Sequence, residues 1–411
     1  MSSSTPPPAA PSPTPPAPRV VVRRRSGRAG LYAAATVVGI VVVLAGVGSV
    51  THWYGLLPSS SSGGCPAGKT VTGAGASFLS PLISQWQATY TANTSNRVNY
   101  NPSGAGAGIT AWETNTVNFA ASDEPLTGSE IHDLPGTTLT LPVTGGAVTI
   151  VDNIPGFSGP LNLTGVQLAE IYLGNITNWD SSALSSDNHG LPDATIDPVV
   201  RSDAAGTSYV LTNYLSDDDP YFASHVGISI QPDWPSLATE TAQKGNSGLV
   251  KYVASAAGDD SIGYVDLADA RTYDPDGIAA VGNPAGGFIV PTVADTQSAI
   301  DYWGTHQTIP AATGNWSAVT WVNSPGATDY PLATLSYFLV LQNPALAGST
   351  TDPSLALTGA LVEWLDWALE QGQAYANPLL YDVPPASILT QDIAAVETMN
   401  YNGAPIPTCV A

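Results

Sequence analysis

Three short turns rich in glycine, alanine, serine and threonine constrain the fold of this chain most strongly. Their sequences are GAGASF at residues 73–78, SGAGAG at 103–108 and DAAGTS at 203–208. Each turn follows a segment with the pattern of a strand and precedes one with the pattern of a helix. Because strand-like and helix-like segments also alternate through the rest of the chain from Lys69 onward, the sequence predicts an α/β fold with largely parallel sheets.

Hydrophobic periodicity predicts individual elements of this fold. The segment 79–93 is predicted as a helix because apolar residues recur at steps of three and four, as on one helix face. These residues are Leu82, Ile83, Trp86 and Tyr90. A second, amphipathic helix is predicted at 359–376, with Leu361, Leu365 and Leu369 in register. Strands are predicted within 146–157, 261–267 and 335–342.

The first 68 residues differ in composition from the rest of the chain. Residues 1–28 are rich in proline and serine, cannot bury a core, and are predicted to form a disordered cytoplasmic tail. Residues 29–51 carry no charge and follow the sequence RRRSGR, which predicts a transmembrane signal anchor in the cell membrane with everything after it extracytoplasmic. A cleaved signal peptide is the alternative. Residues 52–68 then form a flexible linker.

The two cysteines, Cys65 and Cys409, stand near the two ends of the exported region. Export to an oxidising compartment favours a disulfide bond that ties the end of the domain to its start. Two unpaired thiols, or lipidation of Cys65, are the alternatives.

The charge and motif content exclude several classes of protein. All 33 acidic residues lie after Lys69, and the region from Lys69 onward has six basic residues, so no basic patch is available for nucleic acid. The five histidines are widely separated and no HExxH sequence occurs, which argues against a zinc site. Neither GxxxxGK nor GxSxG occurs, and GAGASF lacks the third glycine of the dinucleotide fingerprint. We therefore expect no metal, no cofactor and no nucleic-acid partner.

The three small-residue turns are candidate anion sites. Helix N-termini present unpaired N–H groups and partial positive charge, and small residues let an anion approach them. Glycines in such turns are also common for purely structural reasons, so one turn alone is weak evidence. Three turns together, with Arg201 immediately before the third, favour a shared anion site.

A series of ordered blocks runs from about Val71 to about Pro405. The blocks include TGAGASF, NTVNFAASDEPL, IYLGNITNWD, VVRSDAAGTSYVLTNYLS, KGNSGLVKYV and SIGYVDLA. Together they resemble the PstS-type phosphate-binding proteins of high-affinity phosphate ABC transporters. The resemblance implies a two-lobed, periplasmic-binding-protein-like (type II) α/β fold that closes about a hinge over one phosphate. Lobe one would be residues 69–143 and 325–411, and lobe two residues 144–324.

The resemblance also implies a set of ligand-binding residues. They are Ser77, Phe78, Ala105, Asp123, Arg201, Asp203, Ala205, Gly206 and Thr207. At Ala105 and Ala205 the family usually has serine, so two hydroxyl donors are absent. Because each hydrogen bond to a charged group contributes about 1.5–3 kcal/mol, weaker phosphate binding is expected at these two positions.

Two of the implied contacts have roles that follow from the chemistry of phosphate. Asp123 would accept a hydrogen bond from a protonated phosphate oxygen and would repel sulfate, which carries no proton near neutral pH. The structural alternative for Asp123 is a cap of the turn at a strand end. Asp203 would orient the Arg201 guanidinium, or would instead cap the helix that follows.

The function implied by the resemblance is non-enzymatic. A monomeric, membrane-anchored protein would bind inorganic phosphate outside the cytoplasm and deliver it to the permease subunits of an ABC transporter. A cell-surface phosphatase or other hydrolase is one alternative, because a fold can assemble dispersed serines and aspartates. A ligand-free envelope or sensor protein on the same fold is the other, because of Ala105 and Ala205.

Overall fold

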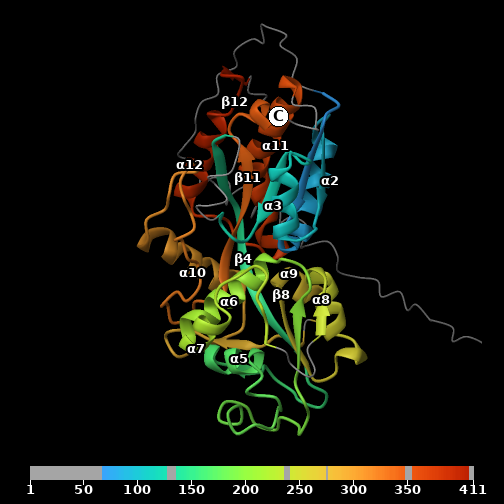
Figure 1. Ribbon diagram of the computed structural model, residues 1–411, viewed down its shortest axis with the longest axis vertical. Coiled ribbons are helices and arrows are strands. Elements are labelled where there is room, and N and C mark those ends of the chain that lie inside the picture. Colours follow the sequence, from blue (N-terminus) through green and yellow to red (C-terminus); the bar gives the residue numbers. More distant parts are fainter. Residues whose placement is uncertain (1–66, 127–135, 236–240, 275, 348–353, 407–411) are drawn as a thin grey trace, which may run out of the picture. The chain divides into compact units, whose positions relative to one another are not determined.

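Two long strands, β4 (Thr138–Asn153) and β11 (Ala333–Leu341), form the centre of an eight-stranded sheet in the computed structural model (Figure 1). The structure describes residues 67–126, 136–235, 241–274, 276–347 and 354–406, which belong to one compact unit, Gly63–Ala411. The predicted tail and anchor, nearly all of the linker, Cys65 and Cys409 lie outside these residues. Within the described ranges, no helix has both the length and the apolar character needed to cross a bilayer.

The sheet has the strand order β2-β1-β3-β11-β4-β8-β6-β7. The outer strands are β1 (Thr70–Gly75), β2 (Arg97–Asn101), β3 (Phe119–Ser122), β6 (Asp197–Arg201), β7 (Thr241–Gln243) and β8 (Ser261–Asp266). Strands within each outer group of three are parallel, as predicted. The pairs β3–β11, β11–β4 and β4–β8 are antiparallel, so the prediction of a largely parallel sheet is wrong at the centre.

We call β2, β1 and β3 with their helices the first half, and β8, β6 and β7 with their helices the second half. The helices of the first half are α2 (Ser80–Asn93), α3 (Ala105–Glu113), α11 (Leu355–Leu369) and α12 (Ala386–Glu397). The helices of the second half are α5 (Gly165–Tyr172), α6 (Gly206–Asp218), α7 (Pro220–His225), α8 (Gly245–Val253) and α9 (Leu267–Tyr273). Figure 1 shows each set gathered around its own strands.

Strand β4 runs through both halves of the sheet. All of its residues except Asn153 are buried, as expected for a strand that is covered on both faces. Residues 138–147 pair with β11, whereas residues 148–153 pair with β8. Gly145 and Gly146 lie immediately before the point where the partner strand changes. This part of β4 therefore connects the two halves.

The two predicted helices have different outcomes. Helix α2 confirms the prediction for 79–93, and all four residues of its predicted apolar face are fully buried. Helix α11 begins at Leu355, ends at Leu369, and is followed by a 3-10 turn rather than continuing to residue 376. It is not amphipathic, because Trp364 and Trp367 are buried as well as Leu361, Leu365 and Leu369. Both indoles pack edge-on against Trp86 of α2, which explains why this helix is apolar on most sides.

Helix α10 (Val293–His306) packs with the first half of the sheet. Its Ile300 shares one hydrophobic cluster with Trp112 of α3, Leu339 of β11 and Ile388 of α12. Trp321, which follows α10 in the chain, belongs to the same cluster. The predicted boundary between lobe two and lobe one at residue 324 remains a prediction, and from this packing we propose that the chain returns to the first half before α10.

Candidate anion-binding site

Arg201 is the last residue of β6, and its side chain is almost completely buried, with 1% of its surface exposed. Its guanidinium forms a fork with Asp203: Nε donates to Oδ1 at 2.9 Å and Nη2 donates to Oδ2 at 2.6 Å. Burial opposes ionisation of Asp203, but the hydrogen bonds and charge of Arg201 outweigh it and lower the pKa of this carboxyl. Arg201 and Asp203 therefore form an ion pair that is largely buried.

The remaining N–H groups of Arg201 meet two hydroxyls and one amide. Nη1 donates to Thr207 Oγ1 at 2.9 Å and to Asn246 Oδ1 at 2.5 Å. Nη2 also donates to Ser77 Oγ at 3.2 Å. All five guanidinium N–H groups thus have acceptors, and Ser77 comes from the first half whereas the others come from the second. The hydroxyl hydrogen of Ser77 is left free to donate elsewhere, whereas the Thr207 hydroxyl donates to Asn246 Oδ1 at 3.4 Å.

Asp203 contacts the Arg201 guanidinium and does not cap the helix that follows it. Helix α6 begins at Gly206 with Ala205 as its N-cap residue, and no side chain caps it. The second contact of Asp203 is with another helix start, because its Oδ1 accepts from Gly245 N at 3.1 Å. The alternative in which Asp203 caps the following helix is therefore wrong.

The first turn of α6 presents unpaired backbone donors. The N–H groups of Gly206 and Thr207 have no hydrogen-bond partner among the described residues. Ala205, which the family resemblance implies as a contact, instead donates its N–H to Ile230 O at 2.8 Å. The free donors of the third turn are therefore one and two residues further along the chain, where the helix dipole also favours negative charge.

Asp123 follows β3 and faces the start of α6 from the first half of the sheet. A Cβ added to Gly206 would lie 2.3 Å from Asp123 Oδ2, so only glycine allows this approach. Asp123 Oδ1 accepts a short hydrogen bond from Ser336 of β11. Burial raises the pKa of Asp123 to about 7, although Ser336 and the charge of Arg201 partly offset the effect. The turn after β3 is instead held by Ser122 Oγ, which accepts from Glu124 N, so Asp123 does not cap it.

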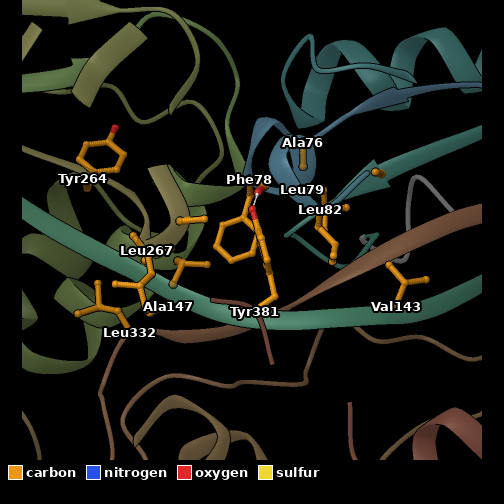
Figure 2. Close-up of a cluster of buried hydrophobic side chains, with 14 of the residues drawn as sticks. Ala76, Phe78, Leu79, Leu82, Val143, Ala147, Tyr264, Leu267, Leu332 and Tyr381 are labelled. Atoms are coloured by element: carbon orange, nitrogen blue, oxygen red, sulfur yellow. Dashed lines mark hydrogen bonds between the residues drawn. The ribbon is translucent and has the colours of Figure 1, made fainter. Parts of the chain in front are cut away.

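The first turn places Ser77 at the site and Phe78 beneath it. Both residues belong to a 3-10 helix, Ser77–Leu79, that leads into α2. The Phe78 ring packs edge-on against Tyr381, with 5.7 Å between ring centroids, and Tyr381 donates its hydroxyl to Phe78 O at 2.6 Å (Figure 2). Gly146 of β4 lacks the side chain that would meet this ring, since an added Cβ would lie 2.8 Å from Phe78 Cζ. The aromatic pair therefore fixes the position of the turn.

The second turn approaches the third one closely. Ala105 is fully buried and begins α3, and its neighbour Gly106 donates its N–H to Ala204 O at 3.3 Å. Gly104 has φ of 101°, and a Cβ there would lie 2.6 Å from Asp203 Oδ2. Glycine is therefore required at position 104 both by its backbone conformation and by space. The two halves of the sheet are in contact along this line.

Sequence reasoning missed Asn246, which is fully buried at the start of α8. Besides accepting from Arg201, Asn246 donates its Nδ2 to Asp266 Oδ2 at 2.8 Å and its backbone N–H to Ser77 Oγ at 3.3 Å. The sequence did contain a signal, because KGNSG at 244–248 is a fourth small-residue turn that opens a helix. Ser336 was also missed, and no local pattern in its strand distinguishes it.

The structure thus brings Ser77, Asp123, Asp203, Gly206 and Thr207 together around Arg201. Such a set of free N–H groups, hydroxyls and one arginine, with a single carboxyl that changes charge near neutral pH, is suited to a small oxyanion. Among the described residues, no group of three or more histidine, cysteine, aspartate or glutamate side chains is placed to hold a metal ion.

Comparison with known proteins gives matches both in sequence and in structure. The sequence profile described as "PBP superfamily domain" matches residues 60–370. The chain is 35% identical to the phosphate-binding protein PstS of Xylella fastidiosa strain 9a5c over 330 residues, which cover 78% of this chain and 83% of that protein. It is 33% identical to PstS of Pasteurella multocida, with 78% and 88% covered.

Solved structures share the fold at lower identity. The high-affinity periplasmic phosphate-binding protein PfluDING, bound with phosphate, superposes with a TM-score of 0.61 at 20% identity and covers 79% of this chain and 93% of its own. The phosphate-binding protein from Stenotrophomonas maltophilia gives a TM-score of 0.54 at 22% identity, with the same coverage. These likenesses establish the two-lobed α/β fold, while the sequence matches establish the relationship. The chain therefore belongs to the PstS family of phosphate-binding proteins within the PBP superfamily.

Proposed function

We propose that this protein binds one inorganic phosphate between the two halves of its sheet, at Arg201. The observation that carries the proposal is the buried Arg201 guanidinium, which touches a hydroxyl from each half and lies beside the free N–H groups of α6. A phosphate that enters a dry site needs a donor for each oxygen, and these groups are donors of the right kind. The phosphate-binding relatives named above support the same ligand.

The hydroxyls of Ser77 and Thr207 explain how an arginine without spare N–H groups accepts a ligand. Each hydroxyl oxygen accepts from one guanidinium nitrogen, and neutral oxygens are weaker acceptors than a phosphate oxygen. Phosphate oxygens would replace the two hydroxyls on Nη1 and Nη2, and the displaced hydroxyls would turn to donate to the anion. Asp203 and Asn246 would keep their contacts and hold the guanidinium in place.

Asp123 would select phosphate over sulfate. Its carboxyl faces the N-terminus of α6, where the anion would lie, and its pKa of about 7 makes it largely ionised above neutral pH. The carboxylate form accepts the proton of hydrogen phosphate, whereas sulfate offers only lone pairs and is repelled. Ser336 would hold the second carboxyl oxygen so that the first stays directed at the ligand.

The proposed role in the cell is that of the extracytoplasmic component of a phosphate ABC transporter. The protein would close around phosphate by bending β4 near Gly145 and Gly146, and would deliver the anion to permease subunits. Membrane attachment through residues 29–51, a disulfide between Cys65 and Cys409, and a monomeric state belong to the same proposal. The named relatives are binding proteins, which supports a protein without enzymatic activity over a surface phosphatase.

Calorimetric titration tests the proposal directly. The wild-type protein should bind phosphate at one site, and Arg201→Lys should weaken binding by at least about 100-fold, because an ammonium cannot replace the five N–H groups of the fork. Lys69→Gln, which changes the charge far from the site, is the control and should bind as the wild type does. Absence of binding by the wild type would favour the ligand-free alternative, and turnover of a chromogenic phosphomonoester that Arg201→Lys abolishes would favour the hydrolase.

A further inference from the structure

Two cavities lie against the contact between the halves of the sheet. The first, of about 390 Å³, is lined by residues that include Ser77, Asn246, Lys244 and Tyr273. The second, of about 420 Å³, is lined by residues that include Gly106, Ala204, Ile230 and Glu113. Each cavity borders one of the cross-half hydrogen bonds, Asn246 N to Ser77 Oγ in the first case and Gly106 N to Ala204 O in the second.

The two cavities differ in charge. The first contains Lys244, whose side chain is exposed and has no ion-pair partner among the described residues. Tyr273 also lines this cavity, and its ring centroid lies 4.5 Å from the Nζ of Lys251. The described lining of the second cavity includes Glu113 and no basic residue. In a chain with 33 acidic residues and a formal net charge of −22, an exposed lysine in the lining of this cavity is a local exception.

The first cavity also contains one acidic residue, Asp269, which only partly reduces the difference in charge between the two cavities. Its side chain is mostly buried, and burial raises its pKa although the neighbouring Asp266, Lys251 and Arg201 oppose the rise. Lys244, by comparison, is exposed at the surface of the cavity. An anion approaching from solvent therefore meets the lysine before it meets the carboxyl.

We propose that the cavity lined by Ser77, Asn246 and Lys244 is the entrance by which phosphate reaches Arg201, and that Lys244 attracts the anion into it. The Ser77–Asn246 hydrogen bond separates this cavity from the guanidinium, so its opening admits the anion to Nη2, which is already in contact with Ser77. The inference rests on the proposed function. It adds a route and a steering residue, because a fixed charge at the mouth of a cleft raises the rate of association.

Stopped-flow measurement of phosphate association distinguishes steering from binding. Lys244→Gln should lower the association rate about threefold to fivefold at about 10 mM salt, as expected for one unit charge acting on a dianion at about 8 Å in water. The difference should shrink to less than about twofold near 300 mM salt, where the screening length is about 6 Å. The dissociation rate should not change, because Lys244 does not touch the bound anion in this scheme.

Two matched variants make the result decisive. Lys69→Gln removes the same charge near Arg97 and Thr70, at another cavity, and should leave the association rate unchanged. Glu113→Gln removes a negative charge from the second cavity and should also have little effect. An unchanged rate for Lys244→Gln, or a faster rate for Glu113→Gln, would place the entrance elsewhere and overturn the inference. Failure of the wild type to bind phosphate at all would instead overturn the proposed function, and this inference with it.

Discussion

Replacement of Asp123 by asparagine removes the selective carboxylate while keeping its shape. The asparagine oxygen can still accept from Ser336, and the asparagine amide then occupies the position of Oδ2 beside Gly206. The amide donates a hydrogen bond, whereas the carboxylate accepts one. Hydrogen phosphate therefore loses an acceptor for its proton, and sulfate gains a donor.

The magnitude follows from one charge-assisted hydrogen bond. Loss of about 1.5–3 kcal/mol corresponds to phosphate affinity about 10-fold to 150-fold weaker. Since sulfate affinity rises at the same time, the ratio of the two dissociation constants should fall by more than this factor. Calorimetric titration with each anion at about pH 8 is the appropriate assay, because the Asp123 carboxyl, with a pKa of about 7, is then mostly ionised.

The anion selectivity of the wild type should also depend on pH. Below pH 7 Asp123 becomes protonated and can donate to sulfate, so discrimination against sulfate should weaken as the pH falls from 8 to 6. Asp152→Asn is a matched control, because Asp152 is also buried and its pKa is also raised to about 7. The causes at Asp152 are burial and the charge of Asp274, and Arg201 does not contribute. An unchanged selectivity ratio in Asp123→Asn, with both variants folded, would refute the role of Asp123.

Two further substitutions test the packing of the site and the connection between the halves. Gly206→Ala should destabilise the protein by about 1–3 kcal/mol in denaturant unfolding and weaken phosphate binding, because the new methyl group meets Asp123. The control Gly248→Ala places its methyl group in open space within α8 and should stabilise the protein by about 0.5–1 kcal/mol. Equal effects of the two substitutions would argue against the Asp123 contact. Asp382 is fully buried at the point where its backbone pairs with Gly145. Its carboxyl oxygens lack hydrogen-bond partners in the described part of the chain. Burial together with the charge of Asp301 raises its pKa from 3.8 to about 8. The contribution of the neutral carboxyl to the free energy of unfolding is fully present below about pH 4 and is lost as the pH rises through 8. Asp382→Asn should therefore recover roughly 2–5 kcal/mol of stability above pH 8 and flatten the fall in Tm with pH. A parallel fall in Tm in both proteins would contradict this expectation.

Local sequence patterns determined the parts of this protein that depend on neighbours in the chain. The face of α2 and the small-residue turns before α3 and α6 involve residues a few positions apart, so spacing and chemistry are sufficient to predict them. Spacing alone left open whether Asp203 contacts Arg201 or caps α6, and the structure shows the contact with Arg201. The end of α11 and its burial were missed, because a helix covered on most sides has no polar face to mark it.

Only the tertiary structure decided which distant residues meet. Four separate segments of the chain contribute contacts to Arg201 or its neighbours, through Ser77, Asp123, Asn246 and Ser336. Nothing in the spacing of these segments along the sequence indicates that they lie close together. Their meeting depends on the strand order and on β4 and β11 running antiparallel through the centre of the sheet. Periodicity specifies which face of an element is buried, but the partner against which it is buried is fixed only when all the elements pack together.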